Sequence, residues 1–61
     1  MSLPKTSISF KEAQKHPSWS NSFAYAENEI NWWVQNPTHE DIIKLTIHFV
    51  ETTIQTERKK Q

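Results

Sequence analysis

The sequence predicts an all-α protein: an antiparallel two-helix hairpin preceded by a short helix or an extended arm. Three observations favour this class. Glycine is absent from the 61 residues, so tight β-hairpin turns would lack the residue that adopts positive φ most easily. Apolar residues recur at helical spacing from residue 19 to residue 34. Prolines at positions 4, 17 and 37 divide the chain into an arm and two apolar stretches.

Signals for helix starts and stops set the expected boundaries. Ser9 and Glu12 have the spacing of a capping box, in which two side chains satisfy free backbone N–H groups at a helix start. Pro17 interrupts that first helix, because proline is tolerated in a first turn and costly later. We therefore expect an N-terminal arm over residues 1–9, a single helical domain over residues 10–56 and a basic C-terminal tail over residues 57–61. The three helices of the domain are expected over residues 10–16, 18–35 and 39–56.

The second expected helix has one apolar seam, which Val34 widens. Steps of four and three residues connect the members of this seam, which are Trp19, Phe23, Ala26, Ile30 and Trp33. Adjacent residues of a helix point about 100° apart, so Trp32 cannot share the core with Trp33. We expect Trp33 to face inward and Trp32 to face outward.

A turn at residues 36–38 separates the second helix from the third. Pro37 pushes the residue before it out of the helical conformation. Thr38 can cap the next helix, with the acidic Asp41 three residues later at the positive end of the helix dipole. A connection this short makes the two helices antiparallel neighbours.

Residues 42–54 are compatible with two secondary structures. Apolar and polar residues alternate between Ile43 and Phe49, which is typical of a strand. A helix is favoured because Thr38 starts one and no turn separates it from the alternating part. As a helix, the segment carries two apolar stripes, one of Ile42, Leu45 and Phe49 and one of Ile43, Ile47, Val50 and Ile54.

The two stripes together cover about half of the helix circumference, which is more than one neighbouring helix needs. A domain of this size also buries only about 60% of the surface of its unfolded chain. Cysteine is absent, so no disulfide stabilises the fold. We therefore expect oligomerisation or docking on a larger protein to complete the fold and to cover the second stripe.

Another expected binding surface lies on the outer side of the second helix. Tyr25 and Trp32 are seven residues apart and fall close to one line, with Asn28 and Glu29 beside them. Large aromatic rings with a polar rim are typical of interface hot spots. The alternative is that apolar residues of the arm cover Trp32, namely Ile8 and Phe10.

The arm followed by two helices resembles the ribbon-helix-helix repressors in its arrangement. In that family, paired arm strands enter the DNA major groove. The resemblance implies that Lys5, Ser7 and Ser9 face the groove. It implies that Thr6, Ile8 and Phe10 face inward. A small dimeric DNA-binding regulator is therefore the alternative function, although the net charge is zero and such domains gain affinity from basic surfaces.

The composition argues against catalysis and against several ligand classes. Without glycine there is no nucleophile elbow and no phosphate-binding loop, and no two histidines have the i, i+4 spacing of a helical metal site. No apolar run approaches the roughly 20 residues of a membrane span. We expect no enzyme activity, cofactor, metal, membrane or small-molecule substrate. We expect a cytoplasmic location, since MSLPKTSISF lacks the features of a secretory signal.

The expected function is that of a non-enzymatic protein–protein interaction module, acting as an adaptor, an inhibitor or an accessory subunit. Its partner is expected to be a second copy, a larger protein, or both, with nucleic acid disfavoured. The residues expected to contact the partner are Tyr25, Asn28, Glu29, Trp32, Ile43, Ile47, Val50 and Ile54.

Overall fold

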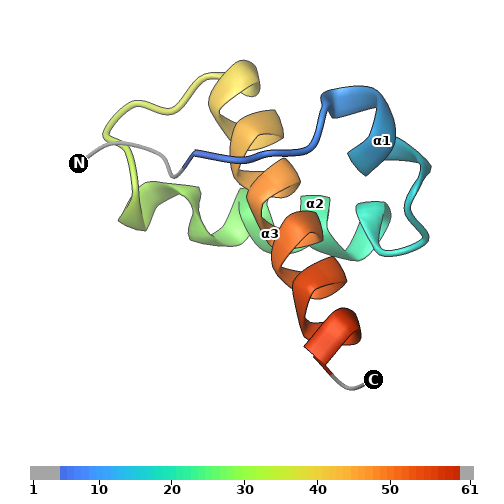
Figure 1. The fold of residues 1–61 in the computed structure, drawn as a ribbon. Helices are drawn as coiled ribbons and strands as arrows, with labels where there is room; N and C mark the ends of the chain where they lie inside the picture. The colour runs from blue at the N-terminus through green and yellow to red at the C-terminus, as the bar shows by residue number, and fades with distance from the viewer. Residues whose placement is uncertain (1–4, 60–61) are drawn as a thin grey trace.

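The computed structural model describes residues 5–59, and all regular structure in this range is helical. In chain order the elements are α1 (Phe10–Lys15), α2 (Trp19–Glu29), the 3-10 helix η1 (Ile30–Trp32) and α3 (His39–Lys59). Figure 1 shows α3 running diagonally through the molecule, with α2 crossing it and the arm passing over it toward α1. The prediction of an all-α protein is confirmed. Because no strand occurs within residues 5–59, the strand alternative for residues 42–54 is wrong.

The molecule is elongated, with extents of 38, 20 and 18 Å, because α3 is much longer than the helices packed on it. No helix within the described range is both long and apolar enough to cross a membrane. Residues 1–4 of the expected arm and residues 60–61 of the expected tail lie outside the described residues.

α1 begins where the capping box predicts. The Ser9 hydroxyl accepts the backbone N–H of Glu12 at 3.2 Å. The helix ends at Lys15, one residue before the expected end. His16 has an extended backbone, with φ −71° and ψ 139°, because the ring of Pro17 disfavours the helical conformation in the residue before it.

α2 is shorter than expected, since its regular turns end at Glu29 and not at residue 35. The chain then tightens into η1, a common way for a helix to finish. The Ile30 carbonyl accepts the N–H groups of both Trp33, at 2.9 Å, and Val34, at 3.0 Å. Asn36 follows with a left-handed φ of 53°, a conformation that asparagine tolerates better than most non-glycine residues.

α3 is longer than expected and includes the first residues of the predicted tail. Its start is a reciprocal capping box: the Thr38 N–H donates to Asp41 Oδ2 at 3.0 Å, and the Asp41 N–H donates to Thr38 Oγ1 at 3.3 Å. Four threonine hydroxyls of α3 donate to the carbonyl four residues earlier, those of Thr46, Thr52, Thr53 and Thr56. These bonds satisfy the hydroxyls locally, so the helix continues through a segment rich in β-branched residues.

α3 supplies one side of two apolar clusters. Against α2 and η1, its buried Leu45 meets Ala26 and Ile30, and the partly buried residues around them are Trp33, Val34, Ile42 and Phe49. Against α1 and the arm, its buried Ile47 and Val50 meet Ala13, and the partly buried residues around them are Ile8, Trp19, Ile43 and Ile54. The division of α3 into two apolar stripes is therefore confirmed.

The expectation that a partner covers the second apolar stripe of α3 is wrong for most of the stripe's surface. Val50 is fully buried and Ile47 is 8% exposed, while Ile43 and Ile54 are partly buried. The arm, α1 and the first residue of α2 fold back onto this side of α3 and remove the stripe from solvent.

Candidate functional site

The most exposed aromatic surface lies on the outer side of α2 and η1. We call Tyr25, Asn28, Glu29 and Trp32 the outer face. Trp32 is 74% exposed and Tyr25 is 56% exposed, and these are the two most exposed large hydrophobic residues in the described range. Asn28 is exposed and Glu29 is half-buried. These four predicted site residues therefore lie on one stretch of chain that runs from α2 into η1.

The two tryptophans face the directions that the sequence predicts, Trp33 inward and Trp32 outward. Trp33 is half-buried and packs against the cluster of Ala26, Ile30 and Leu45. Its ring also meets the His48 ring edge-to-face, with centroids 6.1 Å apart. Trp32, one residue earlier, points away from this core.

The Tyr25 ring is held in place despite its exposure. It packs edge-to-face on Phe49 of α3, with centroids 5.1 Å apart and planes 64° apart. Such aromatic pairs contribute about 0.5–1.5 kcal/mol beyond the apolar area that they bury. Tyr25 therefore presents its free edge to solvent from a fixed position, which lowers the entropy that a binding partner must overcome.

An open groove of about 500 Å³ adjoins the outer face where α2 crosses α3. Tyr25 and Phe49 form its aromatic part, and the other lining residues are Ser18, Asn21, Ser22, Thr52 and Thr53. None of the lining side chains is charged. The sequence analysis missed this groove, although the helical spacing of Ser18, Asn21 and Ser22 before Tyr25 places all four on one side of α2.

The end of α2 is negatively charged and lacks a compensating cation. Glu27 and Glu29 lie in its last turn, which carries no basic residue. Among the described residues, Lys44 pairs with Glu40 at 3.5 Å and His16 Nε2 lies 3.8 Å from Glu57, so neither glutamate of α2 has a cationic partner there. The negative end of the helix dipole adds to the charge of both carboxylates.

Ile8 and Phe10 do not cover Trp32, which is 74% exposed, so that alternative is wrong. Residues 5–9 instead lie along α3, where Glu51 Oε2 accepts the backbone N–H of Ser7, the Ser7 hydroxyl at 2.9 Å and the backbone N–H of Ile8 at 3.3 Å. Ile8 packs on the α1–α3 cluster, and Phe10 meets Trp19 with ring centroids 5.6 Å apart.

These hydrogen bonds favour the ionised form of Glu51. The backbone N–H of Ser7 is the main cause of the lowered pKa of this carboxyl, and the Ser7 hydroxyl, the Ile8 N–H and the nearby His48 act in the same direction. Glu51 is thus the acceptor that holds the arm, a role that the sequence pattern did not predict. The ribbon-helix-helix resemblance requires arm strands that are free to pair, whereas this arm is bound to α3.

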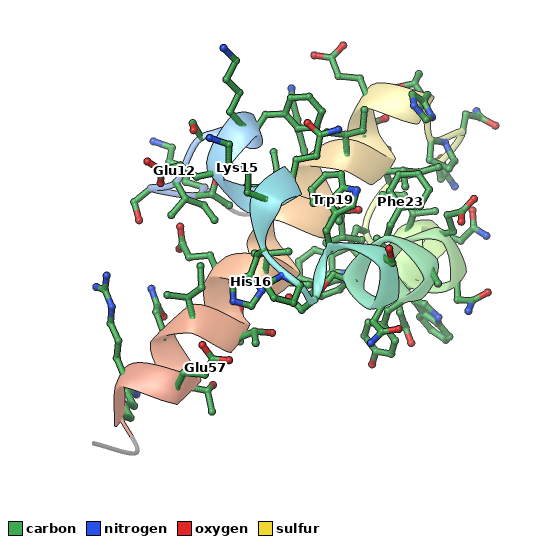
Figure 2. All side chains as sticks on the ribbon, turned by 90° about the vertical axis from the view of Figure 1, so that its right-hand side faces the viewer. Glu12, Lys15, His16, Trp19, Phe23 and Glu57 are labelled. Atoms are coloured by element: carbon green, nitrogen blue, oxygen red, sulfur yellow. The ribbon has the colours of Figure 1, made fainter. Side chains whose placement is uncertain are left out.

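His16 connects the turn between α1 and α2 with the end of α3. Its Nδ1 accepts the Ser18 backbone N–H at 3.1 Å and lies 2.7 Å from the Ser18 hydroxyl oxygen, while Nε2 faces Glu57. Figure 2 shows His16 and Glu57 pointing toward each other, with the neighbouring rings of Trp19 and Phe23 farther along, at the upper right. Within residues 5–59, no group of three or more possible metal ligands lies together.

Comparison with models of protein families, with curated proteins and with solved structures gives no match. The function must therefore be inferred from the geometry and charge of the residues themselves.

Proposed function

We propose that the protein is a small, non-enzymatic interaction subunit that binds another protein chain through the outer face of α2 and η1. The observation that carries this proposal is the exposure of Trp32, at 74%, together with that of the Tyr25 ring, which is 56% exposed and packed on Phe49. Tryptophan and tyrosine contribute a large part of the binding energy in protein interfaces when polar neighbours exclude water around them. Asn28 and Glu29 are the polar neighbours here.

The composition around the outer face supports the same function. The residues of the face and the adjoining groove are mainly tyrosine, tryptophan, asparagine, serine and threonine. Protein surfaces that bind other proteins through rigid aromatic residues and adaptable hydrogen-bonding residues have a similar composition. The groove is open, whereas sites for small substrates are enclosed pockets that bury most of the ligand.

In this proposal the hairpin of α2 and α3 is completed by association, and the protein acts in the cytoplasm as an adaptor, an inhibitor or an accessory subunit.

Site-specific photocrosslinking tests the proposal. A benzoylphenylalanine residue replaces Trp32 in the full chain, and a matched variant carries it at Lys11, an exposed position of α1. We expect adducts of defined mass from position 32 and none of comparable yield from position 11. We also expect Tyr25→Ala to reduce the yield at position 32. Equal yields at both positions, or none at either, would count against the outer face.

A further inference from the structure

We infer that the occupant of the outer face is a second copy of this chain, whose Arg58, at the end of its α3, binds Glu29 and Trp32. This inference rests on the proposed function and names the partner that the face fits. Three observations carry it: the uncompensated charge at the end of α2, the exposed aromatic ring next to that charge, and the separation of charges along the chain.

The end of α2 breaks a local rule of helix stability. Acidic residues destabilise the last turn of a helix and basic residues stabilise it, each by about 0.3–1 kcal/mol at exposed positions. α2 has two glutamates and no basic residue there. α3 obeys the rule, with Arg58 and Lys59 in its last turn. A cation from outside α2 would therefore relieve an unfavourable interaction that no lysine or arginine within residues 5–59 relieves.

The chemistry next to Glu29 fits an arginine. Glu29 lies four residues after Tyr25 and three before Trp32, and residues at these spacings are neighbours on one side of a helix. A guanidinium group stacks on the face of an indole or a phenol, and its N–H groups also bind a carboxylate in the same plane. One arginine side chain can therefore contact Glu29 and Trp32 together.

The chain itself supplies this cation. No lysine or arginine occurs between Lys15 and Lys44, whereas Glu27, Glu29, Glu40 and Asp41 fall in that interval. Arg58 is the only arginine of the sequence, and it is exposed in the last turn of α3. The net charge of zero removes the long-range repulsion that would oppose association of two identical chains.

The two contact sites are far enough apart to act at the same time. Figure 1 shows the green end of α2 with η1 at the left of the molecule and the red end of α3 at its lower right. In a two-fold dimer, Arg58 of each copy then meets Glu29 of the other, which gives two equal contacts and a closed assembly.

Charge reversal tests the pairing in the full chain. Analytical ultracentrifugation over about 2 to 200 µM gives the dimer Kd of the wild type, Glu29→Arg, Arg58→Glu and an equimolar mixture of the two variants. We expect each variant alone to raise the Kd by about tenfold or more, which corresponds to about 1.4 kcal/mol. The mixture restores association, because each heterodimer regains two opposite-charge pairs.

Matched controls separate the pairing from general charge effects. Glu27→Arg changes the same turn of α2 by the same charge but on the opposite side, and Lys11→Glu matches Arg58→Glu in charge. We expect both controls to leave the Kd within about threefold of the wild type. Arginine at position 29 suits the end of α2, so circular dichroism should show unchanged helicity and exclude unfolding as the cause.

Three outcomes would overturn the inference. They are a wild type that stays monomeric throughout the concentration range, a dimer that Glu29→Arg and Glu27→Arg weaken equally, and a mixture that fails to reassociate. In each of these cases the crosslinking at position 32 still decides the proposed function separately, because a foreign protein bound there gives an adduct of a different mass.

Discussion

Trp32 and Trp33 show how one step along the chain separates a core residue from a surface residue. The rotation between neighbours places the ring of Trp33 against Ala26, Ile30 and Leu45, while the ring of Trp32 stays 74% exposed. The two residues are adjacent and chemically identical, so each is the natural control for the other.

We expect Trp33→Ala to lower the free energy of unfolding by about 3 kcal/mol, the lower end of the range for core tryptophans, because the ring is only half-buried. Trp32→Ala should change it by less than about 0.5 kcal/mol at concentrations where the chain is monomeric. Urea denaturation followed by circular dichroism measures both values. A larger loss for Trp32→Ala would show that the helix register is different in solution.

Glu51 makes the position of the arm depend on pH. Its pKa lies below the ordinary value of 4.5 in the folded chain because Ser7 and Ile8 donate to the carboxylate. The folded state therefore binds fewer protons than the unfolded state at this group. The stabilisation is fully present above pH 4.5 and is lost as the pH falls through the lowered pKa.

We expect Glu51→Gln to be less stable than the wild type near neutral pH and to lose less stability on acidification. Unfolding free energies measured from about pH 7 to about pH 3 should show the two curves converging below pH 4.5. Ser7→Ala removes only the hydroxyl donor and should give an intermediate curve. Parallel curves for all three proteins would contradict the role of Glu51.

At the scale of elements, the starts of helices are predicted from sequence more accurately than their ends. Ser9 with Glu12 and Thr38 with Asp41 mark the first turns of α1 and α3 correctly, because a cap is a local hydrogen bond between residues three apart. The end of α2 depends on how η1 packs on α3, which is a tertiary interaction. The sequence pattern therefore extends α2 six residues too far.

We expect Thr38→Ala to lower the free energy of unfolding by about 1 kcal/mol, because α3 loses the acceptor for the Asp41 N–H. Thr38→Ser keeps a hydroxyl in the same place and should stay within a few tenths of a kcal/mol of the wild type. Thermal and urea denaturation of the two variants provide the comparison. Equal losses would indicate that the methyl group of Thr38, and not the cap, is responsible.

The second apolar stripe of α3 shows where reasoning from periodicity reaches its limit. The pattern assigns Ile47 and Val50 to a buried face correctly, but it does not say what covers that face. The covering residues are Ala13 on a six-residue helix and Ile8 in a segment without regular structure. Neither segment has a periodicity of its own that would link it to α3.

At the scale of the whole molecule, the predicted surface site divides into two parts. The outer face of α2 is predicted correctly in its exposure because it depends only on helical geometry over seven residues. The α3 part is wrong in its exposure because it depends on the return of the arm. Predictions of exposure are therefore reliable here within one helix and unreliable across the chain.

The proposed association should make the stability of the protein depend on its concentration. Mass action stabilises a folded dimer at higher concentration, and a hundredfold increase should raise Tm by roughly 5–10 °C for a domain of this size. Differential scanning calorimetry at two such concentrations measures the shift, and Trp32→Ala should abolish most of it. A Tm that is independent of concentration in the wild type would contradict self-association.

The bond between Ser7 and Glu51 also has a consequence for biosynthesis. The two residues are separated by 44 positions, so the arm leaves the ribosome long before its acceptor exists outside the exit tunnel. The arm can therefore reach its final place only after Glu51 has also emerged from the tunnel. Until then, Ile8 and the apolar side of α1 remain available to chaperones and to other nascent chains.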